Sequence, residues 1–131
     1  MPPLPPADHL AIQSLHARYN HAIHLGDGVA WAACFTADGV FSNARERVSG
    51  AEALAAYAAE FSKARNARYW VDNLLLEATP TGARGTCYLL LLHIGQLGQP
   101  AAVALTGIYT DQLVKVGDEW KFAARNIERD R

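Results

Sequence analysis

Three residues in the last third of the chain could act together chemically: a tyrosine, an aspartate and an arginine. Tyr109 and Asp111 lie in one apolar run, and Arg125 lies in the next, after a turn at Gly117-Asp118. If the two runs pair as an antiparallel hairpin about this turn, Asp111 stands roughly opposite Arg125, and both project to the same side as Tyr109. Because a lone buried charge is costly, Asp111 and Arg125 can form a structural pair in a pocket wall. Alternatively, Arg125 could receive a substrate carboxylate or phenolate, and Tyr109 could hydrogen-bond an oxyanion.

The size and charge of the chain restrict the classes of protein to which it can belong. Its 131 residues suffice for one domain with its own core, and a net charge of −1 provides no basic surface for nucleic acid or an anionic membrane. The opening Met-Pro-Pro-Leu-Pro-Pro lacks the pattern of a signal peptide, and no apolar stretch approaches the ~20 residues that span a bilayer. We therefore expect a cytoplasmic protein with neither nucleic acid nor a membrane as its partner.

The residue types that bind metals are scattered along the sequence. Cys34 and Cys87 lie in apolar elements and do not form a Cys-x-x-Cys pair, so we interpret them as buried, reduced thiols. Four histidines do not fall into a ligand-spaced cluster with carboxylates: His16, His21, His24 and His93. A phosphate-binding glycine loop and a nucleophile elbow are also missing from the sequence. We expect neither a metal nor another cofactor.

Helices are predicted in the first half of the chain, after a proline-rich tail over residues 1–7. Apolar positions at helical spacing indicate a helix from Asp8 to about residue 25, which Gly26 ends. Asp27 can cap a short helix that reaches Phe35, and a short strand follows at residues 40–41. Ser49, three residues before a glutamate, resembles a capping box and opens a third helix that ends near residue 65.

Long strands are predicted in the second half, over residues 68–78, 84–95, 101–116 and 119–128. Helices that precede a sheet in this way indicate an α+β fold, with the helices packed on one face of a mainly antiparallel sheet. Strands of ten or more residues are long enough to curl around a cavity. We therefore expect a single domain over residues 8–131.

This order of elements, together with three motifs, resembles the SnoaL-like branch of the nuclear transport factor 2 superfamily. The motifs are the segment 19–38, the segment 68–73, and Gly107-x-Tyr109-x-Asp111 followed by Trp120 and Arg125. The resemblance covers nearly the whole chain. It implies an α+β cone whose three helices and strongly curved sheet enclose one apolar pocket, commonly in a homodimer. Members include cyclases, dehydratases, isomerases, oxygenase small subunits and binding modules.

A partial similarity to scytalone dehydratase suggests three further residues with a role in proton transfer. In that pattern an acid near the end of the first helix and two strand histidines surround the substrate; His24, Tyr69 and His93 stand at these positions here. The pairing of Asp with His is therefore lost, although histidine and tyrosine can still transfer protons. As alternatives, His24 can be a solvated residue of the helix end, Tyr69 can satisfy backbone groups, and His93 can face solvent at a strand end.

Other side chains are candidates for binding the substrate. Asn73 shares strand parity with Tyr69 and could orient a carbonyl or hydroxyl group, or else satisfy backbone groups within the sheet. The aromatic residues that could line a pocket for a ring-bearing ligand, or that could equally pack in the core, are Tyr19, Phe35, Phe41, Tyr57 and Phe61.

Two classes of function remain open. The first is a cofactor-free lyase or isomerase, of dehydratase or aldehyde-eliminating type, in which His24, Tyr69, His93 and Tyr109 act on an apolar, aromatic or polycyclic substrate. The second is a non-catalytic module that binds a hydrophobic ligand, or the small subunit of a multicomponent oxygenase. In either case we expect a homodimer through the outer sheet face, because the run 87–92 is apolar on both faces.

Overall fold

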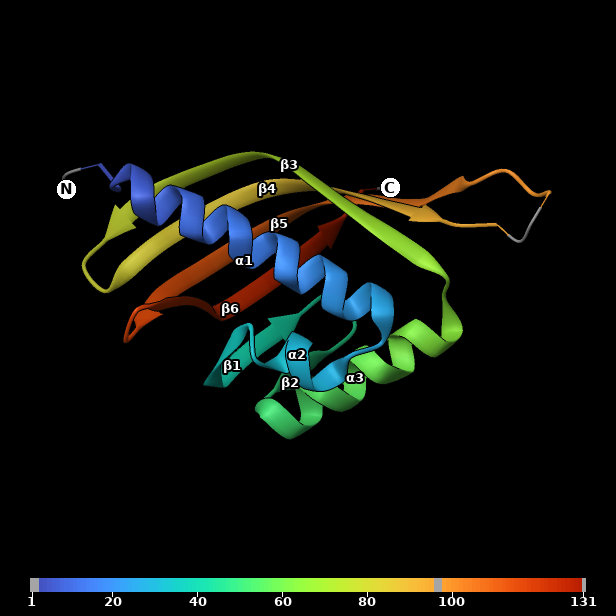
Figure 1. The fold of residues 1–131 in the computed structure, drawn as a ribbon, viewed down its shortest axis with the longest axis horizontal. Helices are drawn as coiled ribbons and strands as arrows, with labels where there is room; N and C mark the ends of the chain where they lie inside the picture. Colours follow the sequence, from blue (N-terminus) through green and yellow to red (C-terminus); the bar gives the residue numbers. More distant parts are fainter. Residues whose placement is uncertain (1–2, 96–97, 131) are drawn as a thin grey trace.

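The computed structural model describes residues 3–95 and 98–130, which form helices packed on a curled, open sheet (Figure 1). The helices are α1 (Pro6–Leu25), α2 (Gly28–Ala32) and α3 (Ala51–Ala64). The strands are β1 (Phe35–Ser42), β2 (Arg47–Ser49), β3 (Ala67–Thr79), β4 (Gly82–His93), β5 (Ala102–Val116) and β6 (Glu119–Arg129). This arrangement confirms the α+β fold expected from the sequence.

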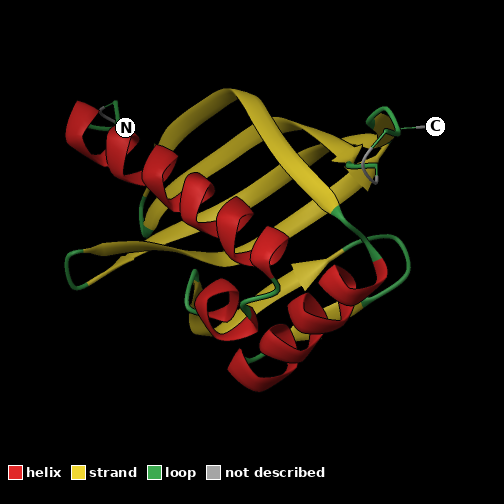
Figure 2. Ribbon diagram, turned by 45° about the vertical axis from the view of Figure 1, so that its right-hand side comes forward, coloured by secondary structure: helices red, strands yellow, loops and turns green. Residues whose placement is uncertain are grey.

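The sheet has six strands in the order β2-β1-β6-β5-β4-β3. All neighbours pair antiparallel except β1 and β6, which are parallel, so the sheet is mixed. This order makes β3 an edge strand. The helix α1 crosses the concave side of the sheet, and α2 and α3 lie near β1 and β2 at its other edge (Figure 2). Within the described residues, β3 therefore has one unpaired edge and contacts α1.

Two of the four helix-end signals predicted from the sequence act as predicted in the structure. Gly26 ends α1 in the left-handed conformation at φ 73°, and the Asp27 side chain accepts a hydrogen bond from the Ala30 amide at the start of α2. In contrast, α1 begins at Pro6 rather than Asp8, because proline suits a first turn that needs no N–H partner. Gly50, not Ser49, precedes α3, without a side-chain cap.

The register of the last hairpin is the one that the sequence predicts. Asp111 pairs with Arg125 and Tyr109 pairs with Ile127 across β5 and β6. All four side chains are buried, which places the ion pair on the concave, core-facing side of the sheet. The hairpin thus carries a charged pair into the centre of the molecule.

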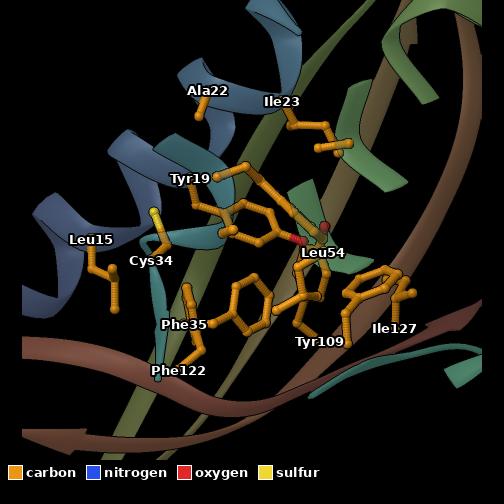
Figure 3. Packing of buried hydrophobic residues seen from close by; sticks show 14 of the residues in the cluster. Leu15, Tyr19, Ala22, Ile23, Cys34, Phe35, Leu54, Tyr109, Phe122 and Ile127 are labelled. Atoms are coloured by element: carbon orange, nitrogen blue, oxygen red, sulfur yellow. The ribbon is translucent and has the colours of Figure 1, made fainter. Parts of the chain in front are cut away.

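The core is mainly aromatic where α1 meets the sheet. The Tyr19 ring extends from α1 toward Phe35 and Phe122, whose ring centroids lie 6.1 and 5.5 Å away (Figure 3). Trp31 packs against Tyr19 from α2, and is fully buried. Among the described residues, no helix combines the length and hydrophobicity needed to cross a membrane.

Candidate functional site

A cavity of about 410 Å³ lies between α1 and β3. One face of α1 supplies residues that recur every three or four positions, as helical geometry requires, and β3 supplies the opposite wall. Cys87 of β4 also lines the cavity. The lining residues are Gln13, His16, Ala17, Asn20 and His21 from α1, and Tyr69, Trp70, Val71, Asp72 and Leu74 from β3.

Three of the lining residues carry a buried polar atom that lacks a hydrogen-bond partner within the described part of the chain. These atoms are Nε2 of His16, Oδ1 of Asn20 and the hydroxyl oxygen of Tyr69. Buried polar groups in proteins are nearly always hydrogen-bonded, and a group that is not needs an explanation such as a bound ligand or water. Their grouping around one cavity suggests that a polar ligand completes them.

Beside the cavity, His16 belongs to a buried network around Arg125. The Nη2 atom of Arg125 lies 3.2 Å from Nδ1 of His16 and 3.6 Å from Sγ of Cys87. Its Nε atom lies 3.1 Å from Oδ1 of Asp111, and the other carboxylate oxygen lies 3.9 Å from Nε2 of His16. The network therefore connects the last hairpin to the wall of the cavity.

Aromatic rings enclose the guanidinium group on its remaining sides. The Cζ atom of Arg125 lies 3.4 Å from the ring centroid of Tyr109, 4.4 Å from that of Tyr19 and 4.6 Å from that of Phe122. Cations are attracted to the faces of such rings, most strongly where water is excluded. Tyr109 and Arg125 are thus held together in the core, and neither lines the cavity.

Burial shifts the pKa values of the residues in this network and of Tyr69. Burial and the nearby guanidinium lower the pKa of His16 to about 2, so this imidazole is neutral. Burial raises the pKa of Asp111 to about 6 against the opposing pull of Arg125, which leaves a carboxylate at neutral pH. Burial also raises the pKa of the Cys87 thiol to about 11 and raises the pKa of the Tyr69 phenol, so both keep their protons.

The network contains the residue types of a metal site. Ligand atoms of His16, Cys87 and Asp111 lie within 4.8 Å of one another, an arrangement that the separation of these residues in sequence did not reveal. However, the Arg125 guanidinium contacts all three of them, and its positive charge stands where a cation would have to bind. The residues present therefore do not fit a metal ion while Arg125 is in place.

His24 and His93, which the sequence suggested as catalytic groups, lie elsewhere. The Nδ1 atom of His24 donates to the carbonyl oxygen of Ala67 at 2.8 Å, which fastens the end of α1 to the start of β3. His93 is exposed at the end of β4. Neither is among the residues that line the cavity, whereas Tyr69 is. Of the three positions taken from the dehydratase pattern, only Tyr69 therefore lines the cavity.

Asn73 also lies outside the cavity, because β3 has a bulge. The pairing with β4 shifts between Asp72 and Leu75, and Asn73 adopts a φ of 57°. Alternation along the strand is broken there, so Leu74 faces the cavity and Asn73 is exposed. The parity that grouped Asn73 with Tyr69 therefore does not hold across the bulge.

The aromatic candidates mostly belong to the core rather than to the cavity wall. Tyr19, Phe35 and Phe41 are buried, and Tyr57 and Phe61 are half-buried between α3 and the sheet. Tyr57 stacks on Trp31 and Phe61, with centroids 5.7 and 6.0 Å apart. These rings shape the interior beside the network, and none of the five lines the cavity.

The polar residues of α1 that line the cavity were not predicted from the sequence. Ile12, Leu15 and Tyr19 define the apolar stripe of the helix, and His16 and Asn20 lie directly beside it, where they meet β3. The available signal was their spacing of four, which places both on one helix face next to the stripe. That spacing does not show that the facing strand leaves a cavity.

Comparisons with known proteins agree with this fold. A family profile described as a SnoaL-like domain matches residues 6–126. A protein of unknown function from Mycobacterium tuberculosis is 32% identical, with 97% of this chain and 77% of that chain covered and a TM-score of 0.87. A search of the curated proteins gave no match.

Two further solved structures are informative. A protein from Catenulispora acidiphila, solved in complex with S-DNPA, is 27% identical, with 95% of this chain and 94% of that chain covered and a TM-score of 0.84. A protein from Novosphingobium aromaticivorans, provisionally described as a scytalone dehydratase, is 22% identical, with 95% and 85% covered and a TM-score of 0.81. The second likeness shows the fold alone.

Proposed function

This chain belongs to the SnoaL-like family, and from that membership and the geometry of its cavity we propose that it is a cofactor-free enzyme of lyase or isomerase type. The cavity between α1 and β3 is the proposed site, and the substrate class is an apolar, ring-bearing molecule with at least one oxygen substituent. The Catenulispora acidiphila protein, which shares 27% of its residues, was solved with S-DNPA, which supports a ligand-binding role for the fold.

The observation that carries the proposal is the grouping of unpartnered polar atoms on one cavity. Within the described chain, His16, Asn20 and Tyr69 each present such an atom and each lines the same space. Val71 and Leu74 supply apolar surface beside them. Binding sites for small molecules commonly combine an apolar wall with a few convergent polar groups in this way.

The proposed chemistry needs a proton donor inside the cavity and a base at its mouth. Tyr69 keeps its proton because burial raises its pKa, so it can hydrogen-bond a substrate carbonyl oxygen as negative charge develops there. His21 is exposed at the mouth, and an imidazole there can remove a proton from the carbon next to the carbonyl. Isomerisation, or elimination of a leaving group from the adjacent carbon, follows from that step.

Solvent deuterium exchange into 2-tetralone, followed by NMR, tests the proposal. This ketone has an aromatic ring and exchangeable protons next to its carbonyl, so a base and a hydrogen-bond donor suffice to catalyse exchange. We expect exchange above the buffer rate, reduced by about 10- to 100-fold in Tyr69→Phe. Tyr88→Phe is the matched control, because Tyr88 lies on the outer sheet face and does not line the cavity. Equal rates for both variants would refute the role of Tyr69.

The base is tested with a second matched pair. His21→Gln should abolish catalysed exchange while leaving ligand affinity nearly unchanged, and His93→Gln should leave both unchanged, because His93 lies outside the cavity. A loss of exchange in His93→Gln instead would restore the residue suggested by the dehydratase pattern.

A non-catalytic ligand-binding module is the second candidate. It is favoured by the placement of His24 and His93 outside the cavity and by the contact of Arg125 with Nδ1 of His16, which occupies a lone pair that a base would need. Binding of 2-tetralone that depends on Tyr69, without exchange by the wild type across the pH range, would support the module over the enzyme.

We also propose that the chain forms a homodimer through the outer sheet face. Trp70, Tyr88, Leu90 and Ile108 are 48%, 57%, 37% and 39% exposed on neighbouring strands there. They border a groove of about 730 Å³. A contiguous apolar surface of this kind commonly packs against a second copy. The expected location is the cytoplasm.

A further inference from the structure

We infer that Arg125 holds His16 as the neutral tautomer with its proton on Nε2, so that His16 and Tyr69 form a pair of donors for a ligand oxygen that carries negative charge. This inference rests on the proposed function of the cavity, and it assigns His16 the role of hydrogen-bond donor rather than base. Arg125 acts through His16 and is a positioning residue.

The tautomer follows from the chemistry of the guanidinium group. All nitrogen atoms of arginine donate hydrogen bonds and none accepts, so the 3.2 Å contact between Nη2 of Arg125 and Nδ1 of His16 requires Nδ1 to be the acceptor. A neutral imidazole with an acceptor at Nδ1 carries its proton on Nε2. Asp111 favours the same tautomer, since its Oδ2 atom lies 3.9 Å from Nε2.

The distance to Asp111 leaves the Nε2 proton available. A separation of 3.9 Å is too long for a hydrogen bond, and within the described residues Nε2 has no other partner. An oxygen atom of a ligand or a water molecule is what such a donor lacks. His16 and Tyr69 line the same cavity, and in the proposed arrangement one ligand oxygen accepts hydrogen bonds from both.

The position of Arg125 is itself determined by its surroundings. Asp111 contacts the guanidinium from β5 and Cys87 from β4, while Tyr19 of α1 and Tyr109 of β5 cover its faces. A side chain held on this many sides cannot easily release Nδ1 of His16. The surrounding groups that can titrate, Asp111, Cys87, Tyr19 and Tyr109, all have raised pKa values because of burial.

A neutral imidazole is well suited to stabilise an oxyanion. Burial and Arg125 keep His16 neutral by lowering its pKa to about 2, so it can donate a hydrogen bond without becoming a cation. Enzymes use neutral histidine in this electrophilic role toward a carbonyl that becomes an enolate. Preorganised donors of this kind act most strongly where water is excluded.

The charge of the cavity narrows the class of ligand. Among the described residues that line it, none is a lysine or arginine, Asp72 is the one carboxylate, and the charge of Arg125 is paired with Asp111. A carboxylate or phosphate has two or more charged oxygens, of which the pair of donors serves one, so the rest would be buried without a counterion. The ligand class is instead a neutral ketone that forms an enolate, or a phenol that forms a phenolate. A hydroxyl group of that ligand can donate to Asn20.

Nitrogen NMR of the ¹⁵N-histidine-labelled wild type tests the tautomer without a substitution. The His16 ring is identified by its proximity to Phe122, whose ring centroid lies 5.4 Å away. We expect Nδ1 to be unprotonated and Nε2 protonated between about pH 5 and pH 8. A proton on Nδ1, or titration of this ring within that range, would overturn the inference.

Binding of 2-naphthol, followed by its absorbance, tests the charge preference. We expect the wild type to bind the naphtholate about tenfold or more tightly than the naphthol, which lowers the pKa of the bound probe by about one unit or more. Tyr69→Phe and His16→Gln should each reduce that preference, and Tyr88→Phe should retain it.

These experiments distinguish a failure of the donor pair from a failure of the proposed function. Tyr69-dependent binding without a preference for the naphtholate would overturn the pair of donors while leaving the cavity as the binding site. No binding of 2-naphthol or 2-tetralone to the wild type would overturn the proposed function and this inference together.

Discussion

Arg125 on the last strand donates a hydrogen bond to Nδ1 of His16 on the first helix, at 3.2 Å, across 109 residues of sequence. This contact joins the buried ion pair with Asp111 to the cavity between α1 and β3. The charged residues of the core and the polar wall of the cavity are therefore one connected system. Substitutions in the ion pair should therefore change both the free energy of unfolding and ligand binding in the cavity.

Breaking the ion pair on one side should be more costly than removing both partners. We expect Arg125→Met to destabilise the fold by about 3–5 kcal/mol, because the fully buried Asp111 carboxyl loses its counterion and must either stay charged or take up a proton. The double variant Arg125→Met/Asp111→Leu should lose much less than the sum of the single variants. Urea unfolding of the wild type, both single variants and the double variant measures this coupling, and additive losses would show that the pair acts as two independent side chains.

The buried imidazole should make stability depend on pH. The pKa of His16 is lowered from 6.5 to about 2 in the fold, so below about pH 6.5 the unfolded chain binds a proton that the folded chain does not. Stability should therefore fall as the pH falls, by about 1.4 kcal/mol per unit below this point. His16→Gln should lack this contribution.

Asp111 contributes to the pH dependence with the opposite sign. Its pKa is raised from 3.8 to about 6, so its contribution to stability falls as the pH rises through that interval. Because Asp111 is present in both proteins, the difference in unfolding free energy between the wild type and His16→Gln isolates His16. Urea titrations at about pH 7.5, 6.5 and 5.5 measure it, and a difference that does not change with pH would contradict a buried neutral His16.

The sequence predicted local relationships well because short-range rules determine them. The register of Asp111 against Arg125 follows from a turn only a few residues away, and Gly26 and Asp27 act as helix signals within their own turns. The end of α1 and the start of α2 therefore agree with the structure.

The site could be predicted only in part, because it depends on contacts distant in sequence. His16 contacts Arg125 across 109 residues of sequence, and no local pattern marks that pairing. Asn73 was assigned to the wrong face because a single residue in the left-handed conformation interrupts the alternation of β3. His24, which the resemblance suggested as a proton-transfer residue, donates to a backbone carbonyl.

The outer sheet face should mediate self-association. We expect Leu90→Asp to shift the protein from dimer to monomer, because the substitution places a charge in the middle of the exposed apolar surface formed with Trp70, Tyr88 and Ile108. Val29→Asp is the matched control, since Val29 is 78% exposed on α2, away from that face. Sedimentation velocity measures the change. A wild type that sediments as a monomer at micromolar concentration would refute the dimer.

The position of Arg125 within a set of metal-ligating residues leads to the last prediction. Removal of the guanidinium in Arg125→Ala leaves His16, Cys87 and Asp111, whose ligand atoms lie within 4.8 Å of one another, without the cation that now separates them. We expect this variant to bind Co²⁺ with the absorption of a cobalt–thiolate bond, and to gain thermal stability with Zn²⁺, since a ligand that binds only the folded state stabilises it. The wild type should show neither effect, and Arg125→Ala/Cys87→Ser should lose the thiolate absorption. A folded Arg125→Ala variant that does not bind Co²⁺ would show that these three side chains cannot adjust to metal geometry.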